Sequence, residues 1–83
     1  MTTEPMARRH EVVLYERAGC HLCEEARELL DDVLGADGYI RVDIERDDEL
    51  VVRYGFRIPV ISVDGEDRAE APIARADLLQ ALG

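Results

Sequence analysis

The chain has 83 residues, of which 47% are hydrophobic and 35% are charged. A chain of this length builds one small hydrophobic core, and this composition argues against both a disordered segment and a membrane protein. The 19 acidic and 10 basic residues give a net charge of -9, whereas a nucleic-acid partner needs a basic face. No apolar stretch resembles a secretory signal or a membrane span. We therefore expect a soluble, cytoplasmic monomer that binds neither nucleic acid nor membranes.

The first half of the chain predicts a strand followed by a helix. Residues 1–9 are polar and lack hydrophobic periodicity, so we expect a flexible N-terminal arm ahead of one domain over residues 10–83. The apolar, β-branched run at residues 11–15 is typical of a strand buried on both faces. The helix that follows ends at Gly35 or Gly38, since glycine commonly terminates helices. Apolar residues recur in this helix at steps of three and four and form a stripe of Leu22, Cys23, Ala26, Leu29, Leu30 and Val33.

A second strand, a short helix and a third strand come next. Residues 39–44 predict the second strand, and a strand-helix-strand unit of this size implies parallel pairing. A short helix is capped by Asp47 or Asp48 and stops at Gly55. Residues 57–63 then predict a strand that contains a proline near its start, where no hydrogen-bond donor is needed.

The last third of the chain predicts a hairpin and a helix. The Asp64-Gly65 pair is a strong two-residue turn signal, so residues 66–71 should return antiparallel as an acidic edge strand. Residues 74–82 predict the final helix. The predicted order is βαβαββα, an α/β arrangement. The apolar stripe of the final helix consists of Leu78, Leu79 and Leu82.

Two cysteines separated by two residues, Cys20 and Cys23, stand at the predicted start of the first helix. The unpaired N–H groups and the dipole of a helix start favour a thiolate at Cys20, whereas Cys23 belongs to the apolar stripe. We predict that Cys20 is the catalytic nucleophile and that Cys23 resolves the mixed disulfide. A positive charge on His21 would tune the redox potential, although Glu24 and Glu25 place negative charge at the same helix end.

The same two cysteines have an alternative interpretation as metal ligands. Thiolates bind copper, zinc or an iron-sulfur cluster shared between two chains. A closed zinc site needs four ligands, however, and only His10 and His21 remain besides carboxylates. We therefore assign no metal ligands and keep a metal-binding module as the alternative function.

Several short segments together carry a family resemblance. The chain resembles the glutaredoxin branch of the thioredoxin superfamily, specifically the small bacterial glutaredoxin-like proteins with a CHLC motif. The resemblance spans residues 12–83 and implies the thioredoxin fold, a four-stranded mixed sheet flanked by three helices. The segments that carry it are Leu14 to Ala26, Val42-Asp43-Ile44, Glu49-Leu50, Tyr54-Gly55, Arg57-Ile58-Pro59-Val60 and Asp64-Gly65.

The resemblance also implies substrate-binding residues around the cysteines. Pro59 would be a cis-proline opposite the disulfide, and the backbone of Ile58 would pair with an extended substrate segment by strand addition. Arg17 stands where glutaredoxins often carry a lysine near glutathione, and Arg57 would flank the same rim and make it locally basic. Where glutaredoxins have a Gly-Gly pair and an aspartate before the last helix, this chain has the different sequence of residues 73–77.

By resemblance, the protein is a glutaredoxin-like disulfide reductase that takes part in electron transfer and cell redox homeostasis. Its substrates would be protein disulfides or glutathione mixed disulfides, with no bound cofactor. Either glutathione or a flavin-dependent disulfide reductase would return the electrons. A redox-inert adaptor that binds partners through the Ile58-Pro59 groove is a further alternative, but the presence of both cysteines argues against it.

Overall fold

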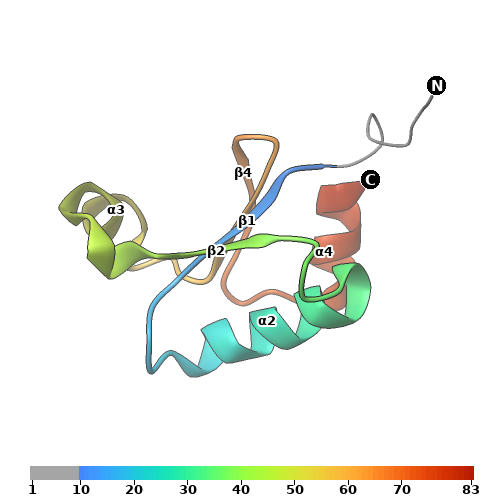
Figure 1. Cartoon of the computed structure of the whole chain (residues 1–83), viewed down its shortest axis with the longest axis horizontal. Helices are drawn as coiled ribbons and strands as arrows, with labels where there is room; N and C mark the ends of the chain where they lie inside the picture. Colours follow the sequence, from blue (N-terminus) through green and yellow to red (C-terminus); the bar gives the residue numbers. More distant parts are fainter. Residues whose placement is uncertain (1–9) are drawn as a thin grey trace.

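The computed structural model describes residues 10–83, and the flexible arm predicted for residues 1–9 lies outside them. The order of strands and helices is βαβαββα, as predicted, with one 3-10 turn added after the second strand (Figure 1). Within residues 10–83, no helix is long and apolar enough to cross a membrane. The elements are β1 (Val12–Glu16), α2 (His21–Leu34), β2 (Ile40–Asp43), η1 (Ile44–Arg46), α3 (Asp48–Tyr54), β3 (Val60–Val63), β4 (Glu66–Glu70) and α4 (Arg75–Leu82).

The strands form one four-stranded mixed sheet in the order β2-β1-β3-β4. Strand β1 is parallel to β2 and antiparallel to β3, and β3 is antiparallel to β4. Tyr15 near the end of β1 pairs with Val60, the first residue of β3. The loop that leads to Cys20 and the segment that contains Pro59 therefore lie at the same end of the sheet.

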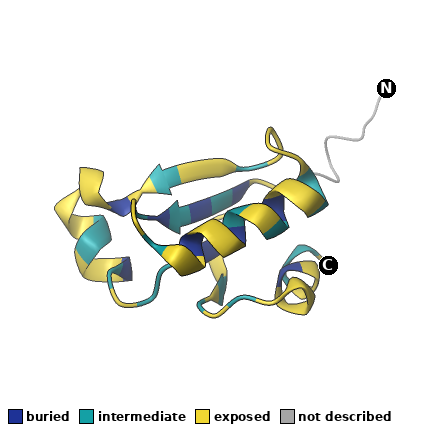
Figure 2. Ribbon diagram, turned by 90° about the horizontal axis from the view of Figure 1, so that it is seen from below, coloured by how far each residue is buried: buried dark blue, intermediate teal, exposed yellow. Residues whose placement is uncertain are grey.

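Helices cover both faces of this sheet. Successive side chains of a strand point to opposite faces, so Leu14 and Tyr15 belong to two separate clusters. Helices α2 and α4 pack on the Leu14 face, and α3 packs on the Tyr15 face. Figure 2 shows buried residues on the strands and on the side of α2 that faces them. The larger cluster contains Val12, Leu14, Ala26, Leu30, Ile61, Val63 and Leu78, and the smaller one contains Ile44, Tyr54 and Val60.

The second strand is shorter than predicted, because it ends at Asp43 and not at residue 44. The Asp43 carboxylate accepts a hydrogen bond from the Glu45 N–H at 2.9 Å and starts the 3-10 turn η1. Ile44 is fully buried in this turn, in the cluster beneath α3. The apolar Ile44 extends the strand pattern in the sequence, whereas the Asp43 side-chain cap ends the strand one residue earlier.

The third strand begins at Val60 and not at residue 57. The N–H groups of Arg57 and Ile58 both donate to the carbonyl oxygen of Tyr54, at 2.8 and 3.1 Å. These bonds continue the winding of α3 past its last residue. Pro59 has no N–H to offer a neighbouring strand, so regular pairing starts one residue later.

Two leucines of the predicted apolar stripes are exposed. Leu22 of α2 is 43% exposed and Leu79 of α4 is 50% exposed. Leu22 precedes the buried Cys23 in α2, and Leu79 follows the buried Leu78 in α4. Adjacent residues of a helix point about 100° apart, so only one residue of each pair can face the sheet.

The predicted hairpin turn is present between β3 and β4. Asp64 and Gly65 have positive φ angles of 53° and 87°, as a two-residue turn between twisted strands requires. The Asp64 carboxylate also accepts hydrogen bonds from the N–H of Glu11 at 2.8 Å and from Nδ1 of His10 at 2.7 Å. The turn thereby fastens the beginning of β1.

We predict that the His10–Asp64 pair makes the stability of the fold depend on pH. The hydrogen bond raises the pKa of His10 above 6.5 and lowers the pKa of Asp64 below 3.8. The contribution of His10 is complete below 6.5 and is lost as pH rises through its folded-state pKa. The contribution of Asp64 to stability is present above pH 3.8 and is lost as the pH falls through the folded-state pKa of Asp64. The pair should therefore stabilise the fold most between these two values.

Denaturant unfolding of the wild type and of Asp64→Asn, at about pH 5 and about pH 8, measures this effect. Asparagine tolerates a positive φ angle, so the variant keeps the turn and removes the charge. We expect the variant to lose more stability at the lower pH. An equal loss at both values would contradict the predicted linkage.

Candidate active site

The two cysteines form a disulfide at the start of α2, with their Cα atoms 5.1 Å apart. Cys20 is the N-cap residue, and its Sγ accepts a hydrogen bond from the Cys23 N–H at 3.2 Å. Cys23 is 1% exposed, whereas Cys20 is partly exposed. The predicted placement of both cysteines is confirmed, and their roles as nucleophile and resolving residue remain predictions.

The short turn before α2 depends on Gly19. Its φ angle is 76°, a conformation that residues with a side chain adopt only with strain. This turn leads from the end of β1 into α2 and leaves the first amides of α2 next to the sulfur of Cys20. The positive end of the helix dipole lies at the same place. After reduction, both effects favour a thiolate on Cys20.

His21 extends into solvent beside the disulfide. Its side chain is 82% exposed, and its Nε2 lies 3.0 Å from the Glu25 carboxylate. A positive charge on His21 would therefore be offset by Glu25. The role of His21 in tuning the redox potential stays a prediction, and the negative charge of Glu25 would weaken the effect of His21.

The Ile58-Pro59 segment lies at the end of the sheet that also carries the loop to Cys20. The Ile58–Pro59 peptide bond is cis, and Pro59 is buried just ahead of β3. The Ile58 N–H already donates to the Tyr54 carbonyl at 3.1 Å. Among residues 10–83, the Ile58 carbonyl oxygen has no backbone partner in the loops and turns. This carbonyl is thus the group that strand addition would use.

The two arginines predicted to bind substrate are both paired with carboxylates. Nε of Arg17 lies 3.4 Å from the Glu45 carboxylate in η1. Arg57 donates to Glu70 at 3.0 Å and to Asp67 at 3.3 Å, both in β4. The expected locally basic rim does not form, because the hairpin brings these two carboxylates beside Arg57. Arg57 is 10 residues from Asp67 and 13 residues from Glu70 in the sequence, so no local pattern predicts these contacts.

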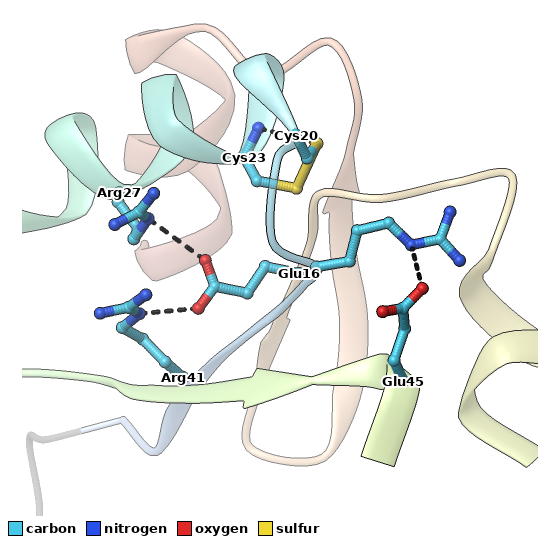
Figure 3. Close-up of a disulfide and its surroundings, with 7 residues drawn as sticks. Glu16, Cys20, Cys23, Arg27, Arg41 and Glu45 are labelled. Carbon is cyan, nitrogen blue, oxygen red and sulfur yellow. Dashed lines mark hydrogen bonds and ion pairs between the residues drawn. A yellow bond between two sulfur atoms is a disulfide. The ribbon is translucent and has the colours of Figure 1, made fainter. Parts of the chain in front are cut away.

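A buried carboxylate near the disulfide was missed from the sequence. Glu16, the last residue of β1, is 7% exposed. Its two carboxylate oxygens lie 3.2 Å from Nε of Arg27 and 2.7 Å from Nε of Arg41 (Figure 3). A sequence signal existed, because Glu16 continues the inward-facing alternation of Val12 and Leu14.

The structure also has a groove of about 650 Å³ between α2 and the beginning of α4. Its only arginine, Arg75, is paired with Asp32 at 2.5 Å. Asp77 does not line the groove and accepts a hydrogen bond from the Ala74 N–H at 2.8 Å. Acidic side chains therefore dominate this surface. The lining residues are Glu25, Glu28, Leu29, Asp32, Ile73, Ala74 and Arg75.

The alternative of a metal centre depends on which side chains lie close together. In residues 10–83, no group of three or more histidine, cysteine, aspartate or glutamate side chains is arranged to hold a metal ion. The two cysteines by themselves supply only half of a structural zinc site. What the arrangement can perform is disulfide exchange at a partly exposed sulfur.

Comparison with known proteins assigns the family. The model of the glutaredoxin-like domain (DUF836) matches residues 11–83. The chain belongs to this glutaredoxin-like family. Both the predicted resemblance and the thioredoxin fold are thereby confirmed. None of the curated protein sequences matches the chain.

Solved structures resemble this glutaredoxin-like domain over most of its length. A structural genomics target protein from X. campestris is 33% identical, with a TM-score of 0.74 over 86% of this chain and 93% of that one. A Nitrosomonas europaea protein solved by NMR is 22% identical, with a TM-score of 0.72 over 100% of both chains. Oxidized glutaredoxin 2 from Chlamydomonas reinhardtii is 18% identical, with a TM-score of 0.58 over 88% of this chain and 71% of that one. The last two show the fold alone.

We predict that alkylation distinguishes the two cysteines of the reduced protein. Iodoacetamide should modify Cys20 more than about tenfold faster than Cys23, because the thiolate is the attacking species and Cys23 is 1% exposed. The rate should report a thiol pKa for Cys20 below the ordinary value of about 8.5. Mass spectrometry of the labelled peptides across a pH series measures both quantities. An ordinary pKa at Cys20, with Cys23 reacting faster, would overturn the assigned roles.

Proposed function

We propose that this protein is a thiol-disulfide oxidoreductase that reduces protein disulfides with its Cys20–Cys23 couple. The observation that carries the proposal is the asymmetry of the pair. Cys20 caps α2 and is partly exposed, whereas Cys23 is buried one turn later. Family membership over residues 11–83 supports a thiol-disulfide redox role.

The reaction follows from this asymmetry. The Cys20 thiolate attacks one sulfur of the substrate disulfide, which breaks the substrate S–S bond and forms a mixed disulfide. The released substrate thiolate takes a proton. Cys23 then loses its proton and attacks the sulfur of Cys20, which releases the second substrate thiol and closes the Cys20–Cys23 disulfide. Two electrons pass from the protein to the substrate. Of the two protons that the substrate thiols take up, Cys23 supplies one and solvent supplies the other.

Regeneration requires an external thiol reductant, and the charge near the site bears on its identity. Glutathione carries two carboxylates and one ammonium group at neutral pH. The groove beside α2 presents Glu25 and Glu28 in addition to the Asp32–Arg75 ion pair, so its lining carries an excess of negative charge. Repulsion between like charges therefore disfavours glutathione there. We propose a flavin-dependent disulfide reductase as the main electron donor and a protein disulfide as the substrate.

The redox chemistry and the make-up of the site bear on the compartment and the oligomeric state of the protein. A reductase needs a compartment in which thiols stay reduced, as in the cytoplasm. The cysteines, the Ile58 carbonyl and the cis-proline all belong to one chain. We therefore propose a monomer that acts in the cytoplasm and takes part in cell redox homeostasis.

We predict that Cys20→Ser abolishes reduction of a protein disulfide such as that of insulin, whereas Cys23→Ser traps a mixed disulfide. The reason is that attack requires Cys20, and release of the substrate requires Cys23. Turnover is measured with either glutathione and its reductase or NADPH and thioredoxin reductase as the electron source. We expect faster turnover with thioredoxin reductase.

Glu28→Gln and Asp32→Gln, made together, serve as the control for the electron source. Removing two groove carboxylates should raise turnover with glutathione and leave turnover with thioredoxin reductase unchanged. No turnover of the wild type with either donor would refute the enzymatic proposal. Stoichiometric copper, zinc or iron in the freshly purified protein would favour the metal-binding alternative.

A further inference from the structure

The disulfide exchange proposed above makes no use of the carboxylate buried beside it. Glu16 is 7% exposed, and its side chain has an arginine on each oxygen. Arg27 comes from α2 and Arg41 comes from β2. A buried carboxylate is costly unless it is paired, so the two arginines are what permit Glu16 at this position.

The fold places this charge cluster, Glu16 with Arg27 and Arg41, on the same side of the sheet as Cys23. Glu16 alternates with Val12 and Leu14, which belong to the core beneath α2. Arg27 follows Cys23 by four residues and so lies one turn further along the same face of α2. Figure 3 shows the cluster in the surroundings of the disulfide, with the Glu16 carboxylate directed away from the sulfur atoms and toward both guanidinium groups.

The cluster carries an excess of one positive charge, because two arginines surround one carboxylate. Arginine remains protonated at any pH of interest, so this charge is permanent. Arg27 is the less exposed arginine, with 32% of its side chain accessible against 54% for Arg41. Other charged or titratable groups lie near the cysteines on the loop, on the first turns of α2 and in η1, namely Arg17, His21, Glu24, Glu25 and Glu45. Asp31 and Tyr39 lie near Arg41 on the other side of the cluster.

We propose that the charge cluster sets the reduction equilibrium of the Cys20–Cys23 couple, with Glu16 and Arg27 acting in opposite directions. The inference rests on the proposed redox function. On reduction, a thiol reductant gives two electrons, the S–S bond breaks, two thiols form and the reductant becomes a disulfide. Cys20 then releases its proton to solvent.

The sign of each effect follows from the charges of the two states. The oxidised pair is neutral, and the reduced pair carries the negative charge of the Cys20 thiolate. Nearby positive charge therefore favours the reduced state, and nearby negative charge favours the oxidised state. Glu16 and Arg27 touch neither substrate nor sulfur in this scheme, so they are positioning residues that act through the field at Cys20.

The test is the equilibrium of the full chain with dithiothreitol redox buffers at about pH 8, where the thiolate is present. Glu16→Gln should shift the equilibrium toward the reduced state by about three- to tenfold, and Arg27→Gln should shift it toward the oxidised state by a similar factor. A tenfold change corresponds to about 30 mV for this two-electron couple. The double variant should return to within about twofold of the wild type, because the excess charge is restored.

Matched controls separate charge from packing. Arg27→Lys keeps the charge and should leave the equilibrium unchanged. Glu66→Gln and Arg68→Gln alter an ion pair of 2.9 Å on β4, which β3 separates from β1, and should also leave it unchanged. Thermal unfolding of each variant verifies that it is folded at the temperature of the measurement.

Two results would overturn the inference. Shifts in the same direction for Glu16→Gln and Arg27→Gln would show that loosened packing of α2, and not charge, controls the couple. A reversible wild-type couple that neither variant shifts would exclude the cluster altogether. A wild type without a reversible two-electron couple would instead refute the proposed redox function itself, so the two failures are distinguishable.

Discussion

The hydrogen bond from the Cys23 N–H to the sulfur of Cys20, 3.2 Å long, caps the first turn of α2, directly after the turn that follows β1. It exists because Gly19 adopts a φ angle of 76° and turns the chain at that place. The same turn exposes one sulfur and buries the other, since the helix periodicity directs Cys23 toward the sheet. The chemical difference between two identical residues thus originates in one local backbone geometry.

The sheet determines what surrounds this junction. Because β1 is antiparallel to β3 and parallel to β2, the sheet end that carries Cys20 also carries Pro59 and the turn η1. Burial on both faces holds these strands in register, with α2 and α4 on one face and α3 on the other. Glu16 and Arg27 add an ionic link between β1 and α2 directly beside the cysteines. The site is therefore built from segments that are distant in sequence and rigidly connected.

Arg17 and Arg57 are both paired with carboxylates, so they form no basic patch at the active site. Tyr54 stacks on Tyr15 with ring centroids 4.3 Å apart and donates to Asp67 at 3.1 Å. Burial, together with this hydrogen bond, raises the pKa of Tyr54 to about 12. Arg57 lies 5.3 Å from the centre of the same ring and is held by β4. Its role in this arrangement is to connect α3 with the edge strand.

Local signals in the sequence were sufficient for the order of elements, for the Asp64-Gly65 turn and for the placement of Cys20 and Cys23, because hydrophobic period, turn residues and helix caps act over a few neighbouring residues. The family resemblance supplied the cis bond before Pro59. Other features were decided only by tertiary structure, namely the outward orientation of Leu22, the carboxylate partners of Arg57 and the two arginine partners of Glu16. Each of these depends on which strand or helix lies opposite, and contacts between residues far apart in the chain leave no periodic trace in one sequence.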